Sequence, residues 1–510
     1  MRGLSAQAVL AAASILGPSL PVPANAARTD YPVRNRTPST CPDYNDYSKS
    51  RHEPFSSGAL ALPNMRPSPE CRTFNSSAVE VVMIPQKVIT DMQARLKDPD
   101  MAMLFANTFP STLDTTVKYF DPDLNLAFII TGRSMAARHG EPVCPSVQTP
   151  SQDPNLQALV KAVINTESRY IAEYPYCGAF QPPQESGLSP SHNYELDSLV
   201  GFLKISRSYY ANTNDTSFMN DNWKSAMNAI MTTIHDQSQS TWTDDWQFVS
   251  YYNWTGTPGA LSPQVPNGGN GEPKMAIGLV ASSHRPSDDL CVFNFITSDN
   301  AMMSVELDHI ADMLDSAASI SATMGDLSKQ ARAYAATIRD AVWNTTLTLN
   351  GVFAYETNGY GGYYVMDDAN VPSLVSLPYL GFLGRDDPTY VKTKDLLFSR
   401  LNPYYAEGKS FSGIGGPHVN ATYPWPMSQI SAIYGTNHDA EITQRLDVIL
   451  RNTAGLGLIH ESVSIYNATD YSRPWFAWAN SYFAEMLLDL AERKPGLIFK
   501  DDTPYVVGVQ

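Results

Sequence analysis

Basic residues are scarce in this chain, and their scarcity narrows its function before any motif is considered. Lys and Arg number 35 against 51 Asp and Glu in 510 residues, the net charge is −16, and no basic cluster occurs. Such an acidic chain disfavours binding to nucleic acid and to anionic membrane surfaces. No apolar run is long enough to span a bilayer. We therefore expect neither nucleic acid nor a membrane as a partner, and the sequence carries no signal of an oligomeric state.

Motifs for metals and nucleotides are also missing. The nine histidines include no His-Glu-x-x-His pattern and no His/Cys cluster of the zinc type. No glycine-rich phosphate fingerprint stands between a strand pattern and a helix pattern. No sequence repeat of the solenoid kind occurs either. We therefore expect no metal and no cofactor.

Cysteine is rare. The chain has five cysteines, an odd number, so at least one thiol lacks a partner within the chain. On an oxidising export route, we expect disulfides between Cys41 and Cys71 and between Cys144 and Cys177. Cys291 is predicted to be a small buried apolar residue rather than a catalytic thiol.

Export itself is indicated by residues 1–26, which are typical of a secretory signal peptide. Arg2 gives a positive start, Ala8 to Leu16 is apolar, and Ala24-Asn25-Ala26 supplies the small residues of a cleavage site. Seven Asn-x-Ser/Thr sequons fit a secreted glycoprotein, at Asn35, Asn75, Asn214, Asn253, Asn344, Asn420 and Asn467. We expect a secreted mature chain that begins at Ala27 or Arg28.

The rest of the chain divides into a short arm and one large domain. Residues 27–78 are rich in Pro, Ser, Arg and Asn and are predicted to be loop-rich. Residues 79–510 show about a dozen helical patterns and little strand, separated by loops with Gly, aromatics and carboxylates. This favours a closed ring of paired helices with functional loops at one end. We also expect a turn at Phe109–Thr116, a helix opening at Asp367–Ser373, and Ser298 as the N-cap of a long helix.

The stretch Arg285-Pro286-Ser287-Asp288-Asp289 carries the clearest chemistry. It places an arginine, a proline-fixed bend and two adjacent carboxylates within five residues. Two neighbouring carboxylates cannot both ionise freely in a poorly solvated pocket, so one keeps its proton and suits a general acid. The alternative is a capped helix start on a solvated turn, since structural ion pairs also gather there.

Three further segments put carboxylates at loop–helix junctions: Tyr194–Ser198, Asp367–Ser373 and His460–Ser462. Aromatic residues accompany them, at Tyr363, Tyr364, Trp425, Trp475, Phe476 and Trp478. Aromatic faces stack on sugar rings and carboxylates accept hydrogen bonds from sugar hydroxyls, so the combination indicates a carbohydrate site. Two simpler explanations compete. Acidic side chains favour the first turn of any helix, and two tryptophans three residues apart on a helix often pack in a core.

Together these stretches resemble glycoside hydrolase family 125, the metal-independent exo-acting α-1,6-mannosidases. The matching segments follow the family order and are Asn107–Lys118, Tyr194–Ser198, Arg285–Asp289, Asp367–Gly381, Gly413–His418, Trp425–Ser428, His460–Ser462 and Arg473–Ser481. The resemblance implies an all-α (α/α)6 barrel and an inverting mechanism that needs no metal.

The resemblance also implies roles for particular residues. The general acid is Asp288 or Asp289, with Asp288 our first choice although residue types do not separate them, and the general base is Glu461. An inverting glycosidase needs two such carboxyl groups about 6.5–9.5 Å apart, with water between the base and the sugar. We predict that the substrate is bound by Glu195, Asp197, Arg285, Asp367, Asp368, Asn370, His418, Trp425, His460, Arg473 and Trp475.

One segment departs from the family. After Thr131-Gly132 the family continues with Asp and then Met-Trp-Leu-Arg-Asp-Ser, whereas this chain continues Arg133-Ser134-Met135-Ala136-Ala137-Arg138-His139. An Arg and an Asp that grip the terminal mannose are therefore missing. The cause is either real divergence or a lost exon piece, and the return of the family pattern downstream favours the second.

The predicted function is a secreted exo-α-1,6-mannosidase that releases mannose from α-1,6-linked mannosides or N-glycans. The missing segment motivates one alternative, a carbohydrate-binding pseudoenzyme of the same fold. Another (α/α)6 glycosidase, of the glucoamylase-like kind, is a weaker alternative.

Overall fold

The structure is a computed structural model that describes residues 58–65, 83–117, 120–121, 126–127, 154–177, 193–254, 265–317 and 322–507. The predicted signal peptide and the departing segment after Gly132 lie outside these residues. So does most of the predicted arm, of which residues 58–65 are described. This short piece is tied to the domain, because Asp100 accepts hydrogen bonds from the amides of Leu60 and Leu62 and Asn107 accepts one from Met65.

The described chain is built mainly from helices of two kinds that alternate along the sequence. Helices of the first kind bury mainly one stripe of their surface, as amphipathic periodicity dictates. They are α3 (Met83–Arg95), α7 (Pro154–Glu173), α9 (Asp221–Gln237), α12 (Ala322–Thr345), α13 (Pro388–Leu397) and α15 (Asp439–Arg451).

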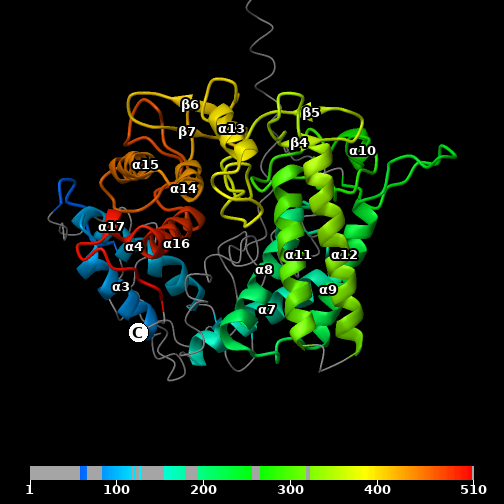
Figure 1. The fold of residues 1–510 in the computed structure, drawn as a ribbon, viewed down its shortest axis with the longest axis horizontal. Coiled ribbons are helices and arrows are strands. Elements are labelled where there is room, and N and C mark those ends of the chain that lie inside the picture. Colours follow the sequence, from blue (N-terminus) through cyan, green and yellow to red (C-terminus); the bar gives the residue numbers. More distant parts are fainter. Residues whose placement is uncertain are drawn as a thin grey trace, which may run out of the picture.

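Helices of the second kind are buried on nearly all sides over their first turns, so they form the inside of the molecule. They are α4 (Pro99–Val117), α8 (Leu196–Thr213), α11 (Thr297–Ala317), α14 (Pro426–Tyr434) and α16 (Ala477–Arg493). Neighbours in this inner layer pack directly, α8 on α11, α14 on α16, and α16 on α4, and α11 also packs on its outer partner α12 (Figure 1). The expected ring of paired helices is thus present.

A series of turns occupies the inner position between α11 and α14, at residues 373–383. Tyr379 lies at its centre: its hydroxyl accepts from Lys204 Nζ of α8 at 2.8 Å and donates to Glu485 Oε2 of α16 at 3.1 Å. Its ring packs on Tyr434 and Tyr482. The segment therefore fills the place of a sixth inner helix, with α13 as its outer partner.

Three details of the predicted secondary structure are wrong. No helix opens at Asp367–Ser373, because the Ser373 and Ser376 side chains bond to each other's backbone and hold turns instead. The turn expected at Phe109–Thr116 belongs to α4, whose buried residues pack on α16 and keep the helix intact past Pro110. Ser298 is not an N-cap, since α11 begins at Thr297 and the Ser298 hydroxyl donates to the carbonyl of Pro372.

Strands in the described part are short. β1 (Phe120–Asp121) pairs with β2 (Leu126–Ala127), and β6 (Tyr405–Glu407) pairs with β7 (Ser412–Ile414), both antiparallel. β4 (Glu356–Thr357) is the middle strand between β3 (Phe295–Ile296) and β5 (Tyr363–Tyr364), with Phe295 opposite Thr357 and Glu356 opposite Tyr364. Two short helices complete the list, α10 (Pro266–Gly269) and α17 (Pro495–Ile498). None of the described helices is both long and apolar enough to cross a membrane.

The described residues include two of the five cysteines, Cys177 and Cys291. Cys291 is half-buried and its thiol is unpaired, and burial raises its pKa well above the usual value, as expected of an unreactive packing residue. Cys41, Cys71 and Cys144 lie outside the described residues, so both disulfide pairings stay predictions.

Loops that precede inner helices are closed at their base by one polar side chain. Asn300, the fourth residue of α11, accepts from the amide of Val280 at 2.7 Å and donates to the carbonyls of Val280 and Ile296 at 2.9 and 2.8 Å. Its amide thus joins the first and last residues of loop 280–296. Figure 1 shows β4, which pairs with β3 at the end of this loop, near the upper ends of α11 and α12.

Asn480, the fourth residue of α16, closes loop 459–476 in the same way. It accepts from the amide of Ile459 at 3.0 Å and donates to the carbonyls of Ile459 and Phe476 at 2.8 and 2.6 Å. Ser428 of α14 does so for loop 414–425 with a hydroxyl, which accepts from the amide of Ile414 and donates to the carbonyl of Trp425. Because inner helices alternate with outer ones that run back, these loops gather at one end of the ring.

We expect Asn300→Ala and Asn480→Ala each to lower the free energy of unfolding by about 2–4 kcal/mol, because each leaves buried backbone groups without partners. Urea unfolding followed by circular dichroism measures this, with exposed Asn222→Ala of α9 as the matched control. Midpoints equal to that of the control would show that these amides do not hold the loops.

Candidate active site

Loop 280–296 is fastened to the start of α8. The amides of Ser283 and His284 donate to the carbonyl of Tyr194 at 3.2 and 3.0 Å, and the Leu196 amide donates to the Ser282 hydroxyl at 3.0 Å. Glu195 lies opposite His284 in a parallel bridge. Two sequence motifs more than eighty residues apart are therefore adjacent, as the resemblance predicts.

Arg285 is buried in an ion pair. Its Nε donates to Glu356 Oε1 of β4 at 2.6 Å, and both side chains are almost fully excluded from solvent. Glu356 Oε2 accepts from the amides of Val292 and Phe293, so this carboxylate also shapes loop 280–296. Burial alone would lower the pKa of Arg285, but the Glu356 carboxylate outweighs it and raises the pKa, so the guanidinium stays charged. Sequence reasoning missed Glu356, which stands alone in a Tyr-rich stretch.

The two candidate acids sit half-buried on a tight turn. The amide of Asp288 donates to the carbonyl of Arg285 at 2.9 Å, and Asp288 has φ of 68°, a left-handed conformation that is costly for a residue other than glycine. Asp289 accepts from the Ser287 hydroxyl at 2.9 Å and lies 3.8 Å from His418 Nδ1. Such strain clusters at functional sites.

The candidate base is held by a relay of hydroxyls. Ser462 donates to the Ser472 hydroxyl, which donates to Glu461 Oε2, both at 2.8 Å. Arg473 Nε lies 3.3 Å from the same oxygen. No hydrogen bond from a described residue reaches Oε1. Glu461 is buried and oriented with one oxygen available, which suits a carboxylate that activates water.

A chain of contacts connects the two candidate carboxylates. The ring of His418, beside Asp289, packs edge-on against Trp425. The ring of Trp425 packs perpendicular to that of Phe476, with ring centroids 5.7 Å apart. The guanidinium of Arg473, beside Glu461, lies 5.6 Å from the centroid of the Phe476 ring. The loops of the candidate acid and base therefore border one region, which the sequence alone predicted.

Buried carboxylates line the starts of α8 and α11. Glu195 accepts from the Ser198 hydroxyl at 3.1 Å, and Asp197 is fully buried in the first turn of α8. Asp299 lies in the first turn of α11, and burial together with Asp197 and Glu195 raises its pKa well above the usual value. Sequence analysis treated Asp299 only as a first-turn residue.

Three of the predicted substrate-binding residues lie in the segment after β5, and each has different partners. Asp367 accepts from the amides of Leu374 and Val375, so it caps the turn segment, and burial raises its pKa to about 8. Asp368 Oδ1 accepts from the backbone and side-chain amides of Asn370. Asp368 Oδ2 has no hydrogen bond within the described residues. Asp368 therefore has a buried oxygen available to a ligand.

His460 is fully buried and stacks on Tyr471 with centroids 3.9 Å apart. Its Nδ1 faces the carbonyls of Arg473 and Pro474 at 3.1 and 2.9 Å, which only accept, so Nδ1 carries the proton and Nε2 is an acceptor. Burial lowers the pKa of His460 to about 4, so the ring is neutral at neutral pH. Trp475 is half-buried and packs on Met65 and Leu458.

Several buried polar atoms at this end of the ring have no hydrogen-bond partner among the described residues. They are Arg285 Nη2, Asp299 Oδ2, the Tyr355 hydroxyl, Asp368 Oδ2, Trp425 Nε1 and His460 Nε2. The guanidinium of Arg285 lies 5.5 Å from the ring of Tyr355, and its charge acts on Asp368. Buried donors and acceptors left open call for a ligand with many hydrogen-bonding groups, which a sugar provides.

The fold and the unbonded polar groups together define a class of protein, an (α/α)6 barrel with a candidate carbohydrate site at one end. Comparison with known proteins agrees. A family described as metal-independent α-mannosidase (GH125) matches residues 98–488. A solved α-mannosidase of Streptococcus pneumoniae, in a non-productive complex with α-1,6-mannobiose, has a TM-score of 0.72 and 26% identity, covering 80% of this chain and 98% of its own.

A curated relative, meiotically up-regulated gene 157 protein of Schizosaccharomyces pombe, is 39% identical over 493 residues, which is 90% of this chain and 94% of the relative. The chain belongs to the metal-independent α-mannosidases of glycoside hydrolase family 125. The family and the fold predicted from the sequence are thereby confirmed, and the protein is a glycoside hydrolase that acts on mannosides.

The neutral buried state of His460 predicts a specific pH dependence of stability. The unfolded chain binds a proton near pH 6.5 but the folded chain only near pH 4, so stability present above pH 6.5 is lost as pH falls towards 4. This amounts to about 3 kcal/mol for a pKa difference of this size. Between pH 7 and pH 4, the free energy of unfolding of His460→Gln relative to that of the wild type should therefore rise by about that amount, as measured by urea unfolding.

Exposed His235→Gln of α9 is the matched control and should track the wild type across this range. A stability difference between His460→Gln and the wild type that stays constant from pH 7 to pH 4 would contradict a neutral buried His460.

Proposed function

We propose that this protein is an exo-acting, inverting α-1,6-mannosidase in which Asp288 is the general acid and Glu461 the general base. The observation that carries the proposal is the arrangement of Glu461, which is fixed by Ser472 and Arg473 through one oxygen while the described residues leave the other oxygen unbonded. In this reaction Glu461 takes a proton from a water molecule as that water attacks the anomeric carbon. Asp288 gives its proton to the departing glycosidic oxygen.

The side chains around this pair divide the remaining work. Asp289 accepts a hydrogen bond from Ser287 and lies near His418, so it orients the loop. Arg285, Asp299, Asp368 and His460 offer open donors and acceptors to the hydroxyls of a terminal mannose. A site this buried fits one sugar at a chain end, which supports exo action. The solved relative binds α-1,6-mannobiose, and this supports the linkage.

Mannose release from α-1,6-mannobiose tests the proposal. The wild type should release mannose, and NMR should show the β-anomer first because inversion changes the configuration. Asp288→Asn and Glu461→Gln should each lower kcat by about 10²–10⁴-fold, the contribution of a general acid or base. Exposed Asp395→Asn of α13 is the matched control. Full activity in Glu461→Gln would remove the base assignment.

A substrate with an acidic leaving group separates the two aspartates. An aryl α-mannoside needs little protonation of its leaving oxygen, so it should restore most of the activity of the variant that lacks the acid. We expect this rescue in Asp288→Asn and not in Glu461→Gln. Rescue confined to Asp289→Asn would transfer the acid role to Asp289.

The chain segment after Gly132 favours one other function, a carbohydrate-binding pseudoenzyme that keeps the barrel without turnover. Mannoside binding without hydrolysis, in protein made from a verified transcript, would establish it. Sequencing the cDNA across Gly132–Glu141 comes first, because an additional in-frame Trp-Leu-Arg-Asp-Ser-like piece would explain the departure as a gene-model error.

We also propose that the protein is secreted and N-glycosylated. All five sequon asparagines in the described part of the chain are exposed, at Asn214, Asn253, Asn344, Asn420 and Asn467. Expression in a eukaryotic host should release it into the medium with an N-terminus at Ala27 or Arg28, and an endoglycosidase should lower its mass. Retention in the cell with an intact N-terminus would contradict export.

A further inference from the structure

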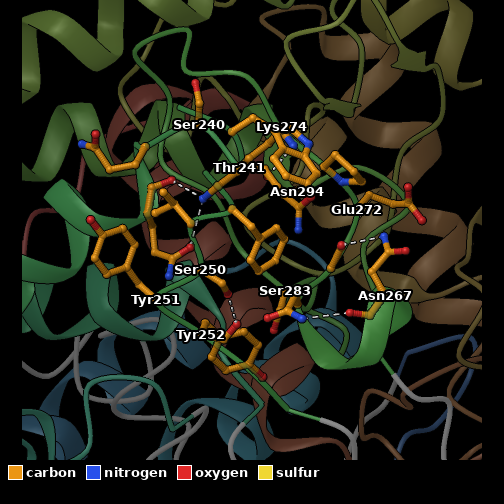
Figure 2. A pocket seen from close by; sticks show the side chains of 18 of the residues that line it. Ser240, Thr241, Ser250, Tyr251, Tyr252, Asn267, Glu272, Lys274, Ser283 and Asn294 are labelled. Carbon is orange, nitrogen blue, oxygen red and sulfur yellow. Dashed lines mark hydrogen bonds between the residues drawn. The ribbon is translucent and has the colours of Figure 1, made fainter. Parts of the chain in front are cut away.

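A hollow lies against loop 280–296. It is a cavity of about 240 Å³ between the connection that follows α9 and residues 265–274 (Figure 2). Figure 2 shows hydroxyl and amide side chains around it, among them Ser240, Thr241, Ser250 and Asn267. Nothing in the proposed mechanism uses this cavity.

The rim of the cavity carries an aromatic turn, which we define as residues 241–249. The turn is a tight hairpin in which the Thr243 amide donates to the Gln247 carbonyl and the Val249 amide donates to the Thr241 carbonyl. Trp242 lies opposite Phe248 and packs edge-on against it at 5.5 Å, and both rings line the cavity. Trp246 lies at the tip of the turn, with its ring centroid 6.4 Å from that of Trp242.

Trp246 is held in an unfavourable arrangement. Its side chain is 77% exposed, and its φ of 59° is left-handed, which is rare for a bulky residue. An exposed tryptophan on a strained backbone is stabilised neither by burial nor by conformation. Such outliers persist where a function uses them, and a flat apolar ring presented to solvent suits stacking on a sugar.

The polar lining of the cavity suits a neutral ligand rather than an anion. Its one amino group, Lys274 Nζ, already donates to Gln237 O and Oε1 at 2.7 and 3.2 Å. Burial lowers the pKa of Lys274 to about 7, so it carries only part of a charge at neutral pH. Asp236 and Glu272 add negative charge to the lining. Hydroxyls and amides remain for hydrogen bonds to uncharged groups.

One wall of this cavity is the loop that carries the candidate acid. Ser283 and Asn294 line the cavity, and both belong to loop 280–296. The Ser283 hydroxyl donates to the Tyr194 carbonyl, next to Glu195, and the Asn294 carbonyl accepts from the Ser282 amide. The cavity and the candidate acid therefore share loop 280–296.

We propose that the cavity and the aromatic turn form a second carbohydrate subsite, which binds the distant sugars of an extended α-mannoside chain whose end is cleaved at the active site. This inference rests on the proposed mannosidase function and narrows its substrate class to chains longer than a disaccharide. Trp246 and Trp242 stack on sugar rings at the rim, and the hydroxyls and amides of the cavity bind their hydroxyl groups.

Steady-state kinetics on α-1,6-mannobiose and on linear α-1,6-mannopentaose test the subsite. Trp246→Ala should raise KM for the pentasaccharide about fivefold, because it loses a stacking contact. It should leave kcat for both substrates, and KM for the disaccharide, unchanged. Leu401→Ala, which removes another highly exposed apolar side chain, is the matched control. An equal effect of Trp246→Ala on both substrates, or none on either, overturns the subsite.

A binding measurement separates this proposal from the enzymatic one. Titration of the Glu461→Gln protein with mannopentaose should quench tryptophan fluorescence, and the quench should weaken in the double variant with Trp246→Ala. If the wild type cleaves no mannoside but this Trp246-dependent binding is seen, the mannosidase proposal fails and the subsite stands. Pentaose binding that is absent, or that is independent of Trp246, overturns the subsite whatever the turnover.

Discussion

One asparagine at the fourth position of each of two inner helices sets the geometry on which the site depends. Asn300 and Asn480 each bond to the first and the last residue of the loop before their helix, and these two loops carry the candidate acid and base. A loop of this length loses much conformational entropy when it is ordered. Joining its ends to a buried helix start fixes both ends at once, so only the interior of the loop is left to be ordered by its own contacts.

Those interior contacts centre on a buried ion pair in one loop and on hydrogen bonds in the other. The Arg285–Glu356 pair is inaccessible to water, and its survival there requires that Glu356 also receive two backbone amides. Loop 459–476 instead uses the hydroxyl relay from Ser462 to Glu461 and the neutral ring of His460. The loop of the candidate acid therefore holds a fixed positive charge, whereas the candidate base sits in a hydrogen-bonded setting with Arg473 at its exposed edge.

The sequence predicted the ring of helices because about a dozen helical patterns alternate with loops that carry Gly, aromatics and carboxylates. It predicted the site because carboxylates and aromatics recur at helix starts. It did not separate residues that hold the loops from residues that meet the substrate. Asp367 was predicted to bind substrate, but both its oxygens accept backbone amides of the turn segment. Asp299 and Glu356 were missed because each partner of theirs lies far away in the chain, and no local pattern reports such a pairing.

The aromatic turn is a second feature that the sequence did not predict. A run of Trp, Thr and Asp in residues 241–249 has no family motif, and periodicity alone gives no reason to notice it. Its interest comes from the backbone, which exposes Trp246 with a left-handed φ, and from Ser283 and Asn294, through which its cavity borders loop 280–296. A contact made there acts on the loop that carries Asp288. Sugar units bound far from the cleaved bond thus have a direct structural route to the acid.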